Sequence, residues 1–174
     1  MEYTFTLKYQ LADDDNDPDV LVERLGAAGC EDALVGIGQP GRLALEFTRE
    51  AADADTAVRS ALADVRRAVP SARLIEVTPD LVGLTDVAEI VGVSRQNMRQ
   101  LMLAHPGSFP APVHEGSASI WHLADVLAWL QSRGSYSLAK EVFDVAQVAL
   151  QVNVAKEGCR LTRSASRELE SLVG

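Results

Sequence analysis

Apolar and polar residues alternate along residues 3–10, and this period of two, together with many aromatic and β-branched residues, predicts a β-strand. Residues 33–37 and 42–48 have a similar composition and are joined by a Gly- and Pro-rich turn at residues 38–41. Residues 73–77 have the same character. The pattern therefore predicts four strands in the first part of the chain.

Two segments between these strands repeat with helical spacing. After the acidic run 13–17, Asp17 and Pro18 form a typical helix entry, and the apolar residues that follow predict a helix ending at Gly29. Residues 54–69 are Ala-rich, with an apolar stripe that predicts a second helix. The order strand, helix, strand, strand, helix, strand predicts a ferredoxin-like domain.

The pattern changes after Pro79, where helical segments replace the strands. We expect helices from Thr85, from Ser94 and over 124–131, with a Pro- and Gly-rich span at 106–116 and a short strand at 119–121. A longer helix is predicted over 138–156, where apolar residues form a broad surface, and the tail after Gly158 is polar and expected to be loose. We predict an α+β protein with a ferredoxin-like domain at 1–79, a helix-turn-helix domain at 80–134, and a C-terminal helix and tail at 135–174.

Residues 84–102, LTDVAEIVGVSRQNMRQLM, carry the strongest functional signal. A helix-turn-helix needs a small residue where its helices touch and a glycine where the chain leaves the first helix, and Ala88 and Gly92 meet these needs. We expect Thr85 to cap the first helix and Ser94 the second. The apolar residues predicted to face inward are Leu84, Val87, Val91, Val93, Met98 and Leu101.

The second helix of this motif presents a polar surface suited to DNA. Arginine forms paired hydrogen bonds with guanine, and asparagine and glutamine form them with adenine, in the major groove. The residues predicted to be exposed are Arg95, Gln96, Asn97, Arg99 and Gln100. The alternative interpretation is two amphipathic helices of an all-α core whose polar residues face solvent.

The residues after this motif resemble the second half of the winged helix-turn-helix of AlpA-like, excisionase-like and MerR-type DNA-binding domains. The resemblance covers about residues 80–133. The matching segments are Phe109-Pro110-Ala111-Pro112-Val113, Ile120-Trp121 and the helix around Asp125, Val126 and Trp129. It implies base reading by the second helix, with Ser94 at a phosphate, and a wing that contacts the backbone or minor groove through His114, Ser117 and Ser119. This chain departs from the family in its wing, which has Glu115 and no Lys or Arg.

The negative charge of the chain is unevenly distributed, and this bears on the predicted binding of DNA. The chain has a formal net charge of -9 and a pI near 4.8, so it offers no general attraction to polyphosphate. Fifteen acids and eight bases in residues 1–79 give a net charge of -7, whereas residues 80–134 have a net charge of -2. Most of the acidity therefore lies outside the predicted DNA-binding domain.

Composition bounds the class of protein. Hydrophobic residues make up 47% of the chain, which is typical of a packed globular protein. We expect a soluble cytoplasmic protein with no membrane association, since no signal-peptide pattern or long apolar run is found. Cys30 and Cys159 are expected to be free thiols.

These observations predict a sequence-specific binder of double-stranded DNA, acting as a homodimeric transcriptional regulator of bacterial type, with no enzymatic activity and no cofactor. Two half-sites would raise its affinity, and both the ferredoxin-like domain and the apolar helix from Leu138 are candidate dimer surfaces, although that helix could equally pack on its own domain. A small-molecule or protein effector could act at the N-terminal domain. The alternative function is an acidic protein-interaction adaptor, or an antitoxin-like protein, on the same scaffold.

Three further patterns suggest chemistry but favour a structural interpretation. Residues 36–41 match G-x-G-x-x-G, but strand-like residues follow where a dinucleotide site needs a helix, so we expect a hairpin turn. His105, His114 and His122 have no metal-site spacing. The acidic run 13–17 lacks the glycine and terminal glutamate of an EF-hand loop and favours a solvated turn.

Overall fold

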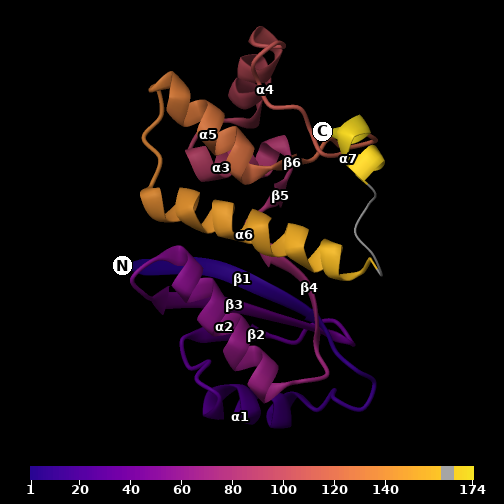
Figure 1. The fold of residues 1–174 in the computed structure, drawn as a ribbon. Helices are drawn as coiled ribbons and strands as arrows, with labels where there is room; N and C mark the ends of the chain where they lie inside the picture. Colours follow the sequence, from indigo (N-terminus) through magenta and orange to yellow (C-terminus); the bar gives the residue numbers. More distant parts are fainter. Residues whose placement is uncertain (162–166) are drawn as a thin grey trace.

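The computed structural model describes residues 1–161 and 167–174, and it is a mixed α+β structure. Figure 1 shows a β-sheet with helices at one end of the molecule and a helical region at the other, with a long helix between them. The elements are β1 (Glu2–Gln10), α1 (Pro18–Ala27), β2 (Ala33–Gly36), β3 (Arg42–Glu50), α2 (Ala54–Ala68), β4 (Arg73–Thr78), β5 (Leu81–Val82), α3 (Leu84–Val91), α4 (Arg95–Ala104), β6 (Trp121–His122), α5 (Leu123–Arg133), α6 (Lys140–Cys159) and α7 (Arg167–Val173).

The four strands among the first six elements form an antiparallel sheet in the order β2-β3-β1-β4. Alternate residues of β1 point into the core, where Phe5 stacks on its register partner Phe47 of β3 with ring centroids 5.4 Å apart. Helices α1 and α2 pack on this apolar face, while Thr4, Glu46 and Thr48 leave the other face open to solvent. The predicted strands and helices of residues 1–79 are all present, with ends that differ by one or two residues.

Local capping explains where the two helices of the sheet unit begin. The side chain of Asp17 accepts hydrogen bonds from the amides of Asp19 and Val20, with Pro18 at the first helical position. Asp53 caps α2 in the same way through the amide of Thr56. One residue of the predicted apolar stripe in α1 differs, because Val20 is exposed and only Leu21 and Leu25 are buried.

A second, separate core lies among the helices after Pro79. Its small sheet pairs β5 with β6, in the register Val82 to Trp121. The strand predicted at 119–121 is displaced, because Trp121 and His122 form the paired strand and Ile120 makes only an isolated bridge to His114. Strand β5 was not predicted, since its two residues are too few to show a period.

Helix α6 lies between the two cores and contributes to both. Val145, Val148 and Ala149 pack with the sheet unit, whereas Ala146 and the partly buried Phe143 pack with the helical unit. Figure 1 shows α6 crossing the molecule between the sheet and the helices α3 and α5. The broad apolar surface predicted for this helix is therefore used mostly within the chain.

Helix α6 also closes the outer edge of the sheet. The carboxamide of Asn153 accepts a hydrogen bond from the amide of Val77 and donates one to the carbonyl of Val77, both 2.8 Å long. The ammonium of Lys156 donates to the carbonyl of Ile75 at 2.5 Å. Because an edge strand presents unpaired backbone groups, these side chains satisfy β4 as a further strand would.

The C-terminal tail contains more structure than its composition suggested. Helix α6 continues to Cys159, and α7 forms a short exposed helix over Arg167–Val173. No helix among the described residues combines the length and apolar character needed to cross a membrane.

Candidate nucleic-acid interface

Helices α3 and α4 meet at a turn whose geometry follows from three local residues. Gly92 has φ 80°, a left-handed conformation that glycine adopts without strain, and its amide donates to the carbonyl of Ala88 at 2.9 Å. Ser94 caps α4 by accepting a hydrogen bond from the amide of Asn97 at 3.1 Å, as predicted. The predicted cap Thr85 is wrong, because Gly83 is the N-cap of α3 and its amide donates to the Asp86 carboxylate instead.

The inner faces of the two helices share one apolar core. Val87, Ala88 and Met98 are buried, and the other residues predicted to face inward are partly buried around them. Met98 is the sole buried residue of α4. This helix therefore rests on the molecule along one narrow line and exposes the rest of its surface.

An aromatic cluster fixes the Pro-rich loop that follows α4. Phe109 meets Trp121 and Trp129 edge to face, with ring centroids 6.0 and 5.0 Å apart. The indole N–H of Trp121 donates to the carbonyl of Pro110 at 3.0 Å, and that of Trp129 donates to the hydroxyl of Ser108. The loop is thereby held against α5, and this fixes the position of the following hairpin relative to α4.

All five polar residues predicted to be exposed on α4 are exposed: Arg95, Gln96, Asn97, Arg99 and Gln100. Figure 1 shows α4 at the end of the molecule away from the sheet. With 3.6 residues per turn, Gln96 and Gln100 lie opposite the buried Met98. Arg95 and Arg99 flank them on one side and Asn97 on the other.

The two arginines of α4 are four residues apart on one helix face. Like charges at this spacing repel by a few tenths of a kcal/mol in an isolated helix. Within residues 1–161 and 167–174, neither guanidinium forms an ion pair. The helix thus keeps a cationic strip that a negatively charged ligand would stabilise.

Residues 113–120 form the small hairpin that the sequence predicted as a wing. The amide of Ile120 donates to the carbonyl of His114 at 3.0 Å, and the amide of Val113 donates to the carbonyl of Ile120 at 2.7 Å. His114 and Ser117 are exposed, and Ser119 is half-buried. The His114 imidazole lies close to Gly116, since a Cβ built on that glycine would be 2.7 Å from Nε2.

The hairpin lies beside the C-terminal half of α4. A hollow of about 350 Å³ has Met102 of α4 on one side and Glu115 and Ser119 of the hairpin on another, with the Pro-rich loop between them. The structure therefore brings Ser119 near the second helix. Glu115 is exposed and adds a negative charge to the hairpin.

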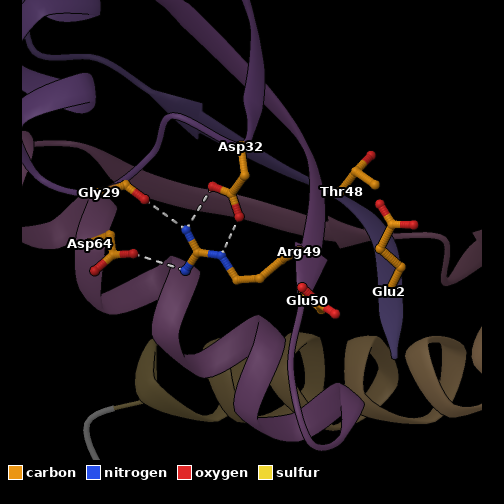
Figure 2. Close-up of a pocket in the computed structure, with 7 residues that line it drawn as sticks. All are labelled: Glu2, Gly29, Asp32, Thr48, Arg49, Glu50 and Asp64. Atoms are coloured by element: carbon orange, nitrogen blue, oxygen red, sulfur yellow. Dashed lines mark hydrogen bonds and ion pairs between the residues drawn. The ribbon is translucent and has the colours of Figure 1, made fainter.

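A larger hollow, about 760 Å³, lies over the sheet unit but centres on an arginine whose donors are all used. Figure 2 shows the Arg49 guanidinium between Asp32, Asp64 and the carbonyl of Gly29. Ser60 accepts a further hydrogen bond, so all five N–H groups of Arg49 have partners. The hydrogen bonds that Arg49 donates to Asp32 first, and then to Asp64, raise the pKa of Arg49 above its usual value.

These contacts identify Arg49 as a structural group of the sheet unit. They also lower the pKa of Asp32, chiefly through its hydrogen bond to the guanidinium. Because no donor of Arg49 is left for a ligand, this hollow is a weaker candidate site than α4.

The other chemical patterns in the sequence have structural roles. Residues 36–41 connect β2 to β3, as predicted, and no helix begins there. In the acidic run, Asp15 pairs with Arg24 and Ser71, while Asp17 caps α1. No group of three or more acidic, histidine or cysteine side chains in the described part of the chain is arranged to hold a metal ion.

Two features of this region were missed by the sequence reasoning. Leu103 is 56% exposed on α4, on the same face as Gln96 and Gln100, and the position of Met98 on a helical wheel could have revealed it. His122 and the fully buried Asp80 are joined by a 2.7 Å hydrogen bond. They are 42 residues apart, so no local pattern could have paired them.

Comparison of the chain with models of protein families, with curated sequences and with solved structures finds no significant match.

Proposed function

We propose that this protein binds double-stranded DNA in a sequence-specific manner and acts as a transcriptional regulator of bacterial type. The observation that carries the proposal is the exposed face of α4, where Arg95 and Arg99 lie without acidic partners in the described structure of a chain with a net charge of -9. An uncompensated cationic strip on a projecting helix suits the phosphates and base edges of a major groove.

Each residue has a role that follows from its position. Ser94 and the first amides of α4 would meet a phosphate, because a helix N-terminus attracts anions. Arg95 and Arg99 would bind guanine or phosphate, and Gln96, Asn97 and Gln100 would reach base edges. In the hairpin, His114, Ser117 and Ser119 would contact the backbone of the adjacent groove.

The proposed architecture is a ferredoxin-like domain followed by a winged helix-turn-helix. The order β2-β3-β1-β4, with two helices on one face, supports the first assignment. The left-handed turn at Gly92 and the hairpin at 113–120 support the second. We propose no catalytic role and no cofactor for either domain.

A homodimer is part of the proposal, since two copies would read two half-sites. With α6 occupied inside the chain, we place the dimer contact on the sheet unit. Strand β2 lies at the edge of the sheet, and its Leu34 is 74% exposed. Such an edge can pair with the same edge of a second copy.

The test is selection of bound fragments from a pool of genomic DNA, at low and at physiological salt, followed by sequencing. We expect one enriched sequence with two half-sites about a helical turn apart. The variant Arg95→Ala/Arg99→Ala should weaken binding to that sequence by at least about 100-fold, since each contact of this kind contributes about 1–3 kcal/mol.

A matched control removes two arginines elsewhere. Arg66 and Arg73 are exposed on the sheet unit, so Arg66→Ala/Arg73→Ala changes the net charge equally without touching α4. Equal loss of affinity in both variants would mean that overall charge, and not the α4 surface, governs binding. Absence of any enriched sequence at low salt would contradict the proposal.

Exposed Leu103 and the acidic residue in the hairpin favour a second candidate, an acidic adaptor or antitoxin-like protein that binds a protein partner through α4. Salt separates the two functions. Affinity for DNA falls steeply as salt rises because counterions are released, whereas an interface dominated by apolar burial changes little.

A further inference from the structure

A cleft of about 530 Å³ lies where the sheet unit, the helical unit and α6 come together. Figure 1 shows β4, β5 and the C-terminal half of α6 converging there. Its lining residues are Ile75, Glu76, Asp80, Leu81, His122, Asn153, Val154, Lys156 and Glu157. None of these residues belongs to the DNA-binding surface proposed above.

The floor of the cleft is a histidine in a fixed orientation. Asp80 is fully buried, and its two carboxylate oxygens accept hydrogen bonds from His122 Nδ1 at 2.7 Å and Asn153 Nδ2 at 2.8 Å. When the carboxylate is ionised and the ring is neutral, Nδ1 carries the proton that Asp80 accepts, and Nε2 is an acceptor. His122 lines the cleft, so this nitrogen is a fixed acceptor for a ligand that enters it.

The walls of the cleft are apolar and exposed. Leu81 and Val154 are 47% and 58% exposed, and the half-buried Ile75 of β4 also lines the cleft. An apolar molecule seated here would remove these side chains from water, at about 25 cal/mol for each Å² buried.

Charge selects the sign of the ligand. Two of the three acidic residues that line the cleft are already paired, Glu76 with Lys8, and Glu157 with Lys156 and Arg160. Asp80 is the lining carboxylate that has no Lys or Arg partner among the described residues. An anion at His122 would face this buried carboxylate, whereas a cation would be attracted to it.

We propose that this cleft is a binding site for a small apolar amine, whose ammonium donates a hydrogen bond to His122 Nε2 and whose hydrocarbon part packs between Leu81 and Val154. An amine meets all three requirements at once: a donor for the histidine, positive charge for the Asp80 carboxylate behind it, and apolar surface for the walls.

The cleft also suits control of the α4 surface, and this part rests on the proposed function. Its walls come from both units, so a bound amine favours one placement of the helical unit relative to the sheet. If the DNA-competent placement differs in affinity for the amine, then the amine and DNA change each other's affinity by the same factor.

The experiment uses the full chain with benzylamine as probe and benzoate as its anionic counterpart with the same ring. The chain has three histidines, so their ring signals in a carbon–proton NMR spectrum are assigned with His105→Gln and His114→Gln variants. We expect benzylamine to shift the His122 signals in a saturable way, with a dissociation constant of the order of 1 mM for so small a ligand. Benzoate should give no saturable shift.

Two matched variants locate the site. Val154→Lys places a cation and a longer chain in the cleft and should weaken benzylamine binding at least about ten-fold. Val22→Lys makes the same change at an exposed valine of α1 and should leave binding unchanged. Both positions are exposed, so neither change is expected to unfold the protein.

The outcomes separate this proposal from the proposed function, because no DNA is present. Absence of a saturable shift, stronger binding of benzoate, or equal effects of the two lysine variants would overturn the amine site. If the amine binds as expected while DNA selection enriches nothing, the site stands and the DNA function fails.

Discussion

Arginine serves two different purposes in the two regions of this protein. In the sheet unit, Arg49 is nearly buried and uses all five donors on Asp32, Asp64, Ser60 and Gly29. In the helical unit, the arginines of α4 are exposed and have no ion-pair partner among the described residues. Arginine links parts of the sheet unit through hydrogen bonds, whereas in α4 it is exposed and available to a ligand.

Local sequence spacing also distinguishes the arginines of α4 from the paired arginine of another helix. In α2, Arg59 follows Asp55 by four residues and the two form an ion pair, whereas in α4 Arg99 follows Arg95 by the same distance. A helix that places a cation where an acid would stabilise it gives up a few tenths of a kcal/mol. In a chain rich in acids, that choice of residues favours a role in binding an external anion.

The largest expected effect comes from breaking the buried arginine. Arg49→Met leaves Asp32 without its ion-pair partner and Asp64 with the exposed Arg67 alone. We expect the free energy of unfolding to fall by about 3 kcal/mol, because removal of one member of a buried pair leaves uncompensated charge. Urea denaturation measures this loss. Arg59→Met, which breaks an exposed pair, is the control and should cost no more than about 0.5 kcal/mol.

A smaller effect is expected where α4 begins. Ser94→Ala removes the side-chain acceptor for the amide of Asn97, and loss of an N-cap of this kind costs about 1 kcal/mol. Thermal denaturation followed by circular dichroism measures it. Ser94→Asp should retain stability, since aspartate also caps helices, and equal destabilisation by both changes would show that the cap is unimportant.

Acid should weaken the sheet unit through the same arginine. The hydrogen bond that Asp32 accepts from Arg49 holds the pKa of Asp32 below the ordinary value of 3.8. The pair therefore stabilises the folded protein fully above that pH, and this stabilisation is lost as the pH falls through the lower pKa of the folded state. Urea titrations between about pH 5 and pH 2 should show stability falling at the acidic end. In Asp32→Asn this fall should be shallower, and an unchanged profile would contradict the assignment.

The smallest effect is expected at the exposed arginines. Arg95→Ala removes one of two like charges four residues apart. The free energy of unfolding should therefore stay within about 0.5 kcal/mol of that of the unmodified protein, and any change should be toward greater stability. The melting temperature measures this change. A large loss of stability would show that Arg95 is structural and would remove the contrast with Arg49.

The elements of the sheet unit could be predicted because each has a clear period and a marked start or stop. The alternation in β1 places Tyr3, Phe5 and Leu7 in the core, and Asp17 begins α1 as expected. The helices α3 and α4 and the turn between them were equally accessible, since Gly92 and Ser94 act over distances of a few residues.

Features that depend on contacts between distant residues could not be predicted. Strand β5 exists because Val82 pairs with Trp121, and two residues carry no periodic signal. The apolar character of α6 indicated burial but gave no information on which partners would bury it. The contacts of Asp80 with His122 and Asn153 span 42 and 73 residues, so the proposed amine cleft was invisible in the sequence.

The contact between Asn153 and Val77 has a consequence for how the chain is made. These residues are 76 positions apart, and translation delivers β4 first, so the sheet leaves the ribosome well before the helix that covers its edge. During that interval the backbone groups of Val77 are open to any neighbouring strand, including the same strand of another nascent chain. A chain truncated before α6 would keep the edge of β4 exposed permanently, and its sheet would be prone to pair with the sheets of other chains.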